Sequence, residues 1–359
     1  MYNDFYEIHY AVICVLIVIT AFGYLSDSSS FFVNGQNKKN ATIQLFLLCI
    51  AMALFMGGRP STEQFGDTQL YVGSYERGIL PYEKEPVFNV IARMCLVSRL
   101  SPFMYLSIIA FLYVFFPALF FIKRTKQPWV GFLFFITSFS FLGYGINGIR
   151  NGLATSLFIL SFCWIRDGKL GAKNLFVILF ISLLSIETHR SLLMPSVCLL
   201  LSIYVVRDIR YAFGIWLVSI PISFLFGASI SSVFMDIGYD DRLDSYLVGD
   251  VNSHGFRWDF ILYSIVPILL GIKIYRRKIK TDTLYDVLLK TYILCNALWV
   301  MVIRANFSNR FAYLSWFLYP LVIYYPISHF RIWKKQNRKC AVILLTYYAF
   351  TFVMYKLGK

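Results

Sequence analysis

Long apolar blocks, separated by short polar connections, follow one another along almost the whole chain. Most blocks have about the length of an α-helix that crosses the hydrocarbon core of a bilayer, roughly 20 residues. We therefore expect an all-α, polytopic integral membrane protein with about twelve transmembrane helices in a single transmembrane domain, residues 1–359. The predicted segments lie near residues 9–25, 41–57, 102–122, 129–146, 150–165, 174–187, 191–206, 211–235, 258–275, 283–303, 311–328 and 340–355.

Composition supports this interpretation. Hydrophobic residues make up 58% of the chain and charged residues only 15%, whereas about 25% of the residues of a soluble domain are charged. These values exclude a soluble globular domain and a disordered chain. The seven cysteines form no CxxC pair, so we interpret them as small core residues and not as a disulfide framework or a metal site. The first block follows Asp4 and Glu7 without a basic segment, which favours a retained helix over a cleaved signal peptide.

The distribution of charge predicts the orientation. Lys and Arg greatly outnumber Asp and Glu in one set of connections, which contains NGQNKKN, KRTKQP, RDGKLGAK, VRDIR, YRRKIK and FRIWKKQNRK. The two kinds of charge are balanced in the other set. Because basic residues accumulate in cytoplasmic loops, the first set is assigned to the cytoplasm and both termini to the other side. The net charge of +15 follows from this asymmetry, and no nucleic-acid site is predicted.

Two extramembrane stretches, residues 58–101 and 236–257, lie on the external side in this orientation. The first contains a segment that starts at Pro86 and carries Val87, Val90, Ile91 and Met94 at helical spacing. This pattern predicts an amphipathic helix on the membrane surface. The second stretch contains the acidic motif GYDDRLD, whose carboxylates could bind a divalent cation. A solvated acidic loop is the favoured interpretation, and no metal site is predicted.

Polar side chains of a specific kind accumulate on the external side. The accumulation of basic residues in cytoplasmic loops does not explain the arginines on the external side. Several of them lie at the ends of apolar helices, where a cation is costly without a partner. Arginines that converge from different helix ends are the usual solution for binding phosphate or diphosphate. The candidate binding residues are Arg59, Tyr71, Arg150, Asn151, Arg304, Asn309, Arg310 and Tyr313, and the candidate catalytic residues are Asp67, Glu85 and His189.

Each candidate has a structural alternative. Asp67 and Tyr71 are four residues apart and would share one helix face, but Asp67 could simply cap that helix. Glu85 precedes the amphipathic helix, where the helix dipole alone favours a carboxylate. His189 lies in a short turn between two apolar helices, with Glu187 and Arg190 beside it, and could carry a proton or be structural.

Two further motifs favour function. Arg150 opens a segment rich in Gly and Ala, which permits close approach of a backbone or a ligand, although a tight turn with a snorkelling arginine is the alternative. Arg310 and Tyr313 are three residues apart at the start of a predicted helix, so both could face one cavity. The glycosylation pattern at Asn306 lies in a tight turn and is interpreted as accidental.

The order of these motifs resembles a known family. R-x₇-D-x₃-Y begins at Arg59, E-P-x-F at Glu85, G-x-R-x₃-A at Gly148, H-x-S at His189 and N-R-x₂-Y at Asn309. This order resembles the EpsG-like branch of bacterial Wzy-type polysaccharide polymerases, which are related to the GT-C class of glycosyltransferases. The resemblance covers roughly residues 40–320 and implies a GT-C-like helical bundle with a periplasmic amphipathic helix.

The resemblance also implies a location and a reaction. Such enzymes lie in the bacterial inner membrane and join undecaprenyl-diphosphate-linked oligosaccharide repeat units on the periplasmic face. The lipid bilayer, the lipid-linked glycan, a chain-length regulator and a flippase are the implied partners, and no cofactor is expected. By this resemblance Arg150 and Arg310 hold the diphosphate, supported by Arg59, while Asp67 or Glu85 activates the acceptor hydroxyl and His189 is the rival base. Tyr71 and Tyr313 would position sugar or lipid.

Two other functions remain open. A flippase or transporter for a lipid-linked glycan would also use arginines, but it predicts polar groups near the middle of the membrane, where Lys290 and Asn296 are the main examples. An O-antigen ligase-type transferase would use the same chemistry as a polymerase. An acyltransferase is disfavoured because it would need a His-centred site and the chain has only four His. The product, whether O-antigen, capsule or exopolysaccharide, stays open.

Overall fold

The computed structural model describes residues 2–27, 35–62, 65–79, 85–168, 170–236, 256–274, 282–304 and 308–357, and all regular elements among them are helices. The predicted all-α fold is therefore confirmed. In chain order the helices are α1 (Tyr2–Asp27), α2 (Gly35–Gly57), α3 (Thr68–Glu76), α4 (Pro86–Val97), α5 (Pro102–Arg124), α6 (Pro128–Ile136), α7 (Phe139–Ile146), α8 (Ile149–Ile159), η2 (Leu160–Trp164), α9 (Ala172–Thr188), η3 (Arg190–Leu192), α10 (Leu193–Tyr204), α11 (Ile209–Asp236), α13 (Trp258–Ile274), α14 (Thr283–Met301), α15 (Ser308–Trp316), α16 (Tyr319–His329) and α17 (Gln336–Leu357).

Every predicted membrane segment coincides with one of these helices or with two consecutive ones. Among the described residues, α1, α5, α11 and α14 contain stretches long and apolar enough to cross a bilayer. The bent pair α6 and α7 adds a fifth candidate. The chain is thus a multi-pass membrane protein, and the number of twelve spans stays a prediction. The seven cysteines are free and buried, which confirms their interpretation as core residues.

The chain divides into two compact units. Unit 1 consists of Met1–Trp164, Phe176–His189 and Ile327–Lys359, and unit 2 consists of Ile165–Leu175 and Arg190–Pro326. The prediction of a single transmembrane domain stays a prediction.

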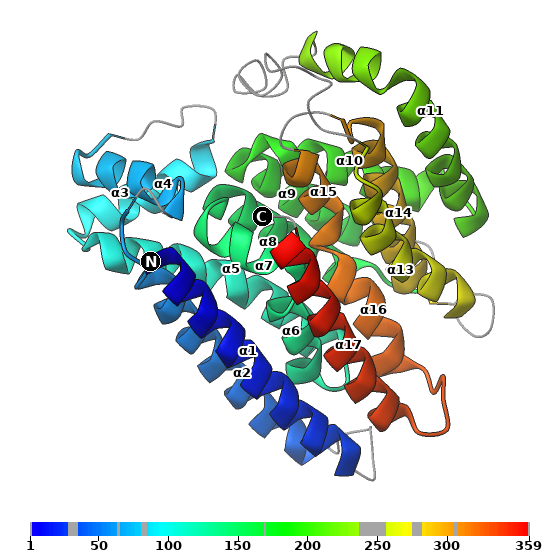
Figure 1. Cartoon of the computed structure of the whole chain (residues 1–359), viewed down its shortest axis with the longest axis horizontal. Coiled ribbons are helices and arrows are strands. Elements are labelled where there is room, and N and C mark those ends of the chain that lie inside the picture. Colours follow the sequence, from blue (N-terminus) through cyan, green and yellow to red (C-terminus); the bar gives the residue numbers. More distant parts are fainter. Residues whose placement is uncertain are drawn as a thin grey trace. The chain divides into compact units, whose positions relative to one another are not determined.

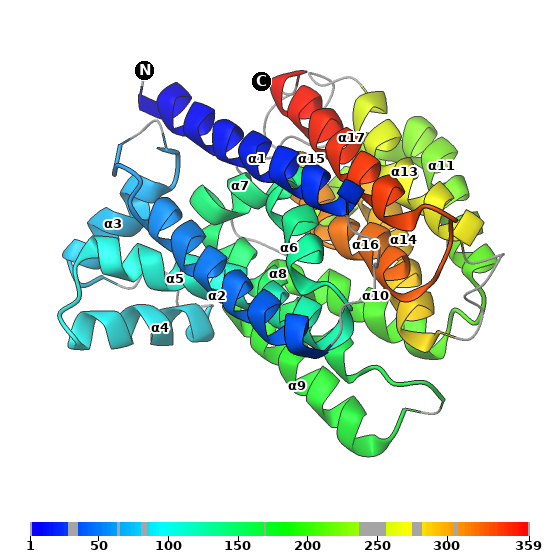
Figure 2. The same cartoon turned by 90° about the horizontal axis from the view of Figure 1, so that it is seen from below.

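Helix pairs with close backbones form the frame of unit 1. In this unit α2 packs along α5, α5 packs against α8, and α1 lies beside α17 although they are at opposite ends of the sequence (Figures 1 and 2). Gly57 permits the first of these contacts, because a Cβ atom there would lie 2.7 Å from the Cα atom of Ser107. This approach fixes the end of α2, from which the next segment leaves.

The predicted segment 129–146 is not one straight helix. It bends by 73° between α6 and α7, at Thr137 and Ser138. A break in an apolar helix frees backbone carbonyls, which need other donors where water is absent. The hydroxyl of Tyr10 donates to the carbonyl of Ile136, and the Thr351 hydroxyl donates to the carbonyl of Thr137 at 3.0 Å. Side chains from α1 and α17 therefore stabilise the break.

The core of unit 2 surrounds α14, which packs against α10, α11 and α15. Its intramembrane polar groups have partners inside the unit. Lys290 forms an ion pair with Asp286 at 2.7 Å and donates to the carbonyl of Val206 at 2.7 Å. Asn296 accepts a hydrogen bond from the indole of Trp216 and donates one to Ser315. These contacts satisfy the two polar residues that a transporter would place in a pathway.

The short helices α3 and α4 continue unit 1 beyond the end of α2 (Figure 2). The predicted amphipathic helix exists as α4, whose inner face buries Phe88 and Cys95 in a cluster with residues of α3 and α5. Val90, Met94 and Val97 on its other face are exposed. That exposed apolar stripe matches a helix at a membrane surface, and the membrane contact itself stays a prediction.

Candidate functional site

Four of the predicted site residues come together in unit 1. Glu85 lies directly before α4, Arg150 is in the first turn of α8, His189 follows the end of α9, and Tyr71 is on α3. The described side chains of Glu85 and Arg150 form an ion pair, and His189 and Tyr71 contact the same pair from either side. Residues from four separate segments therefore meet at one point.

Arg150 is the centre of this group. Its Nη1 donates to Glu85 Oε2 at 2.5 Å, and its Nε donates to the Tyr71 hydroxyl at 3.2 Å. Its guanidinium carbon also lies 5.9 Å from the centre of the Tyr71 ring. Gly152, two residues later on α8, allows this placement because a Cβ atom there would lie 2.6 Å from the carbonyl oxygen of Tyr144. The close packing of α7 and α8 thus places the arginine at a buried helix start.

Glu85 is held between two basic side chains. Pro86 occupies the first position of α4, and the Glu85 side chain makes no capping hydrogen bond to that helix. Its Oε2 accepts from Arg150, and its Oε1 lies 3.6 Å from His189 Nε2. Only 9% of each of the Glu85 and Arg150 side chains is exposed. A carboxylate in this position can accept a proton once the competing cation is drawn away.

Arg59 differs from Arg150 in its charge environment. It is 4% exposed, and among the described residues it forms no ion pair. Its Nη1 donates to the carbonyl of Met56 at 2.6 Å and its Nε donates to Thr68 at 2.9 Å, while its buried Nη2 has no hydrogen-bond partner in the described part of the chain. Burial lowers the pKa of the Arg59 guanidinium to about 10. A buried cation with a free donor is suited to an anionic ligand.

The segment around Arg59 is tied to the turn between α7 and α8. Thr68 donates to the carbonyl of Ile146 at 3.2 Å, and the Asp67 backbone N–H donates to Asn147 Oδ1 at 3.2 Å. Gly66 has φ +54° and a Cβ atom there would lie 2.1 Å from Asn147 Oδ1, so this approach requires glycine. Sequence reasoning missed Thr68 and Asn147. The only signal was their position beside Asp67 and before Gly148.

Asp67 and Asn151 are near this group without joining its ion pair. The Tyr71 N–H donates to the carbonyl of Asp67, so the two residues have the predicted helical spacing. The half-buried Asp67 side chain makes no capping hydrogen bond. Asn151 is half-buried, next to Arg150 on α8. Of the two predicted carboxylates, the structure therefore brings Glu85 into contact with Arg150, and the catalytic roles of both stay predictions.

The remaining predicted residues belong to unit 2. The guanidinium carbon of Arg304 lies 5.4 Å from the centre of the Phe224 ring, and its buried Nε has no hydrogen-bond partner among the described residues. Tyr313 is half-buried and its ring packs near Trp316. Asn309 and Arg310 begin α15, and their side chains, like Asn306 and the acidic motif at residues 238–244, lie outside the described part of the structure. The roles of this group stay predictions.

The described residues contain no group of three His, Cys, Asp or Glu side chains that could hold a metal ion. The site residues of unit 1 provide arginine cations, one carboxylate flanked by an arginine and a histidine, and a tyrosine hydroxyl. Together they can bind an anion and accept a proton.

A family model described as the EpsG family matches residues 42–358, a range that includes all the site residues described above and begins after α1. No curated protein and no solved structure matches the chain significantly.

Proposed function

The chain belongs to the EpsG family, and on that premise we propose that it joins lipid-diphosphate-linked oligosaccharide repeat units at the external face of the membrane. Family membership supports a polymerase-type, glycosyltransferase-like activity in polysaccharide biosynthesis at a multi-pass membrane protein. The undecaprenyl diphosphate carrier, the periplasmic face of the inner membrane and the partner proteins named above are part of the proposal. One observation carries it. A buried carboxylate paired with Arg150, and a buried Arg59 that forms no ion pair among the described residues, belong to the same unit.

The reaction needs a proton acceptor and a site for a departing anion. The acceptor sugar hydroxyl loses its proton to Glu85, and its oxygen bonds to the anomeric carbon of the donor glycan. The bond between that carbon and the diphosphate oxygen breaks, and the electron pair stays on the diphosphate. Arg59 and Arg150 bind the departing charge by preorganised hydrogen bonds, which is the usual means of stabilising such a transition state. His189 can then take up the proton from Glu85.

The resting pair of Glu85 and Arg150 gives a reason for substrate-dependent activation. While Arg150 donates to Glu85, the carboxylate is a weak base because a nearby cation favours its ionised form. A diphosphate offers Arg150 more negative charge and matches its planar fork. When Arg150 turns to the diphosphate, Glu85 becomes a stronger base. The base is then active only when the donor is bound.

The transporter alternative has less support. It would need polar groups that line a pathway near the middle of the membrane. The two such groups in unit 2, Lys290 and Asn296, have hydrogen-bond partners within their own helix packing. The polymerase and ligase alternatives share the same site chemistry and are separated by the product.

The test is to delete the gene in its host and separate the surface glycan on a gel. A polymerase predicts loss of the ladder with a single repeat unit still attached. Loss of all repeat units would contradict the proposal and indicate a flippase or a ligase.

Site variants refine this test. Arg150→Ala, Arg150→Lys and Glu85→Gln in the complemented strain should each lose most of the ladder, because lysine lacks the fork and glutamine lacks the basic oxygen. Arg93→Ala, at an exposed arginine on α4, is the control and should retain the ladder. A normal ladder in all three site variants, at normal protein levels, would remove Arg150 and Glu85 from the mechanism.

A further inference from the structure

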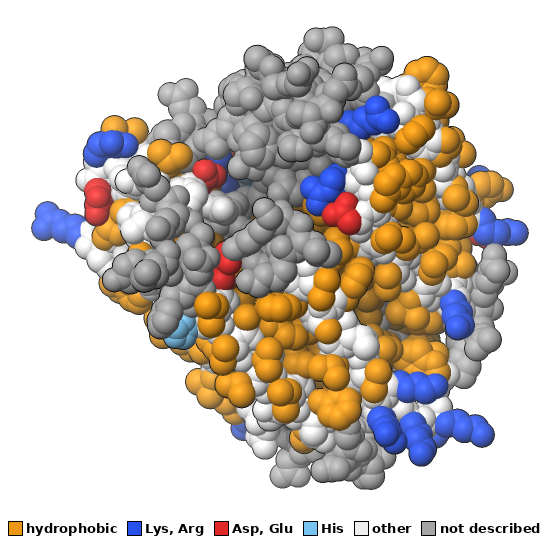
Figure 3. All heavy atoms as spheres, viewed as in Figure 1, with side chains coloured by type: hydrophobic (Ala, Val, Ile, Leu, Met, Phe, Trp, Pro, Cys, Tyr) orange, Lys and Arg blue, Asp and Glu red, His pale blue; other side chains and the backbone are white. Residues whose placement is uncertain are grey.

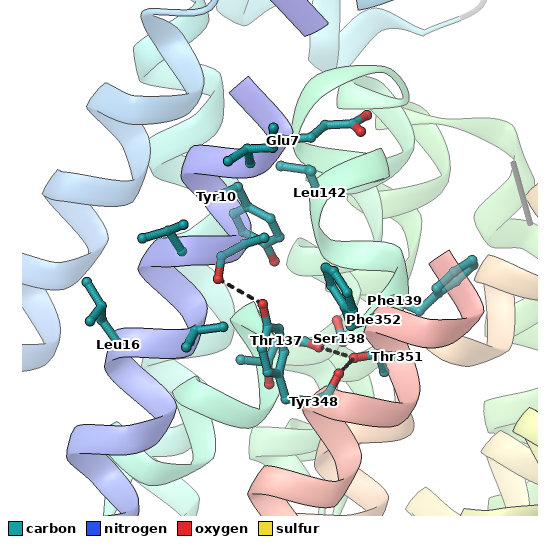
Figure 4. Close-up of a pocket in the computed structure, with 14 residues that line it drawn as sticks. Glu7, Tyr10, Leu16, Thr137, Ser138, Phe139, Leu142, Tyr348, Thr351 and Phe352 are labelled. Carbon is teal, nitrogen blue, oxygen red and sulfur yellow. Dashed lines mark hydrogen bonds between the residues drawn. The ribbon is translucent and has the colours of Figure 1, made fainter. Parts of the chain in front are cut away.

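A cavity of about 370 Å³ lies in unit 1 between α1, the junction of α6 and α7, and α17 (Figure 4). Seven of its lining residues, from Glu7 to Leu16, come from α1, which precedes the residues matched by the family model. The others come from residues 137–142 and from Tyr348, Thr351 and Phe352 of α17. The volume is within the range of small-ligand sites.

The walls of the cavity are almost entirely apolar. The hydroxyl groups of Tyr348 and Thr351 are directed to backbone carbonyls of Ala11 and Thr137, at 2.9 and 3.0 Å, and Figure 4 shows these bonds at its edge. Glu7 is the only charged residue among those that line it. An anionic headgroup would be repelled by Glu7, so the cavity suits a neutral hydrocarbon chain.

The cavity is reached from the lipid side. Ile8, Val12 and Leu16 line it and are exposed by 53%, 50% and 60%. Apolar side chains cover the protein surface along α1 and α17 in the lower centre of Figure 3. Since α1 contains one of the candidate membrane spans, these residues face acyl chains. A lipid chain can enter sideways from the bilayer.

The cavity is also connected to the anion-binding side of the site. Leu142 lines it and packs with Phe65 and Ile146, and Tyr6 and Tyr10 pack against this cluster. The carbonyl of Ile146 accepts from Thr68, which accepts from Arg59. One set of packed residues therefore joins the wall of an apolar cavity to a buried arginine whose Nη2 has no hydrogen-bond partner among the described residues. An amphiphile with an anionic head and an apolar tail matches both ends.

We propose that this cavity binds the hydrocarbon chain of the lipid diphosphate whose charged end lies at Arg59. The inference rests on the proposed function for the identity of the lipid. It assigns to α1 the role of one wall of the lipid site. It also gives the break between α6 and α7 a purpose, because residues on both sides of the break, Thr137 and Leu142 among them, line the cavity.

The test uses photolabelling of the full chain in nanodiscs of neutral phosphatidylcholine. The probe is an isoprenyl diphosphate with a diazirine on its chain. Labelled peptides should come from α1, around Val12 and Val15, and from α17, around Phe352. Excess unlabelled isoprenyl diphosphate should suppress this labelling, whereas the isoprenol without diphosphate should compete much less.

One kind of variant fills the cavity, and the other removes the arginine at which the diphosphate is proposed to lie. Ala11→Trp places an indole in the cavity and should reduce labelling about tenfold, and Arg59→Met should reduce it similarly. Ala51→Trp is the matched control, since Ala51 is exposed on α2 and does not line the cavity. Elution and thermal unfolding verify folding, and Val15→Trp replaces Ala11→Trp if the latter does not fold.

Two results would overturn the inference. One is labelling spread equally over lipid-facing helices such as α9, unaffected by Ala11→Trp. The other is equal labelling by a diazirine phosphatidylcholine that isoprenyl diphosphate does not displace, which would make the cavity a contact of bulk lipid. Labelling reports binding alone. If the deletion strain retains its glycan ladder while labelling behaves as expected, the proposed polymerase activity fails and the lipid site stands.

Discussion

At the scale of single residues, the buried arginines Arg59 and Arg150 of unit 1 illustrate different solutions to buried charge. Arg150 has a carboxylate partner, whereas the acceptors of Arg59 among the described residues are a carbonyl and a hydroxyl. A buried cation without a counter-charge costs several kcal/mol. A protein can keep such a costly residue where a bound ligand supplies the missing counter-charge. Arg59 is therefore the stronger anchor for an incoming anion, and Arg150 responds to it.

The lowered pKa of Arg59 makes stability depend on pH in a defined window. Above pH 10 the folded protein releases this proton, while the unfolded chain still holds it. Because stability rises with pH wherever the unfolded state binds more protons, the wild type should gain stability relative to Arg59→Met as pH rises above about 10. The gain is about 1 kcal/mol per pH unit. Thermal unfolding of both proteins in detergent, from pH 8 to 11, measures the difference.

Below pH 9 the difference between the two proteins should be constant, because Arg59 is charged in both the folded and the unfolded wild type. Other titrating groups contribute equally to the stability of both proteins, so their contributions cancel in the difference. A difference that stays flat up to pH 11, or that shrinks in the opposite direction, would show that Arg59 is not an uncompensated cation.

The ion pair of Glu85 and Arg150 predicts strongly non-additive mutations. Arg150→Met removes the guanidinium that donates to Glu85, and Glu85→Leu removes the carboxylate that accepts from Arg150. Each single change should destabilise the protein by about 3–5 kcal/mol, and the double change should cost less than the sum because it removes both charges of the pair. Denaturant or thermal unfolding of the wild type, the two single variants and the double variant measures the four free energies of unfolding that this comparison needs.

Formation of the glycan ladder by the same variants should not follow their stability. The double variant, although more stable than expected from the sum, should form no glycan ladder, since both the base and the diphosphate ligand are gone. Additive free energies of unfolding would refute the pairing.

The sequence identified these residues individually but not their pairing. Glu85, Arg150, His189 and Tyr71 were named because each is a polar residue beside an apolar helix on the external side. Their contacts cross 65 and 79 positions of sequence between Arg150 and its partners. Spacing within one helix cannot reveal such contacts. For the same reason the sequence could not show that Glu85, and not Asp67, forms the ion pair with Arg150.

At the scale of elements, the break between α6 and α7 shows where hydrophobicity misleads. The segment is apolar throughout, so it predicts one continuous span. Its only polar residues at the bend are Thr137 and Ser138, which are common in helices. The bend exists because Tyr10 and Thr351, far away in sequence, supply donors for the freed carbonyls. A local sequence pattern does not indicate these distant donors.

Thr351→Val should therefore destabilise the protein by about 1–3 kcal/mol, because the buried carbonyl of Thr137 loses its donor while side-chain volume is preserved. Thr346→Val is the matched control on the same helix. Thr346 is exposed and bonds only to carbonyls of its own helix. Thermal unfolding of the two variants in the same detergent compares them. Equal melting temperatures would mean that the junction does not depend on α17.

At the scale of the whole molecule, the sequence predicted a helical multi-pass protein because blocks of apolar residues are a property of the chain itself. It did not predict that α1 lies beside α17 or that contacts separate into two units, since both depend on long-range packing. Helix positions were predictable, and the joining of distant helices was not.

The orientation is the prediction that affects every proposal, because it places Glu85, Arg150 and Arg59 on the external side. Ser98→Cys, in the exposed turn after α4, should react with a membrane-impermeant maleimide on intact spheroplasts, while Ala172→Cys, exposed at the start of α9, should react only after permeabilisation. Background labelling should be low because all seven native cysteines are buried, and burial raises the pKa of the Cys95 thiol, which keeps it protonated. The cysteine-containing wild type is the control. The reverse labelling pattern would place the site in the cytoplasm, where a reaction on exported lipid-linked glycans could not occur.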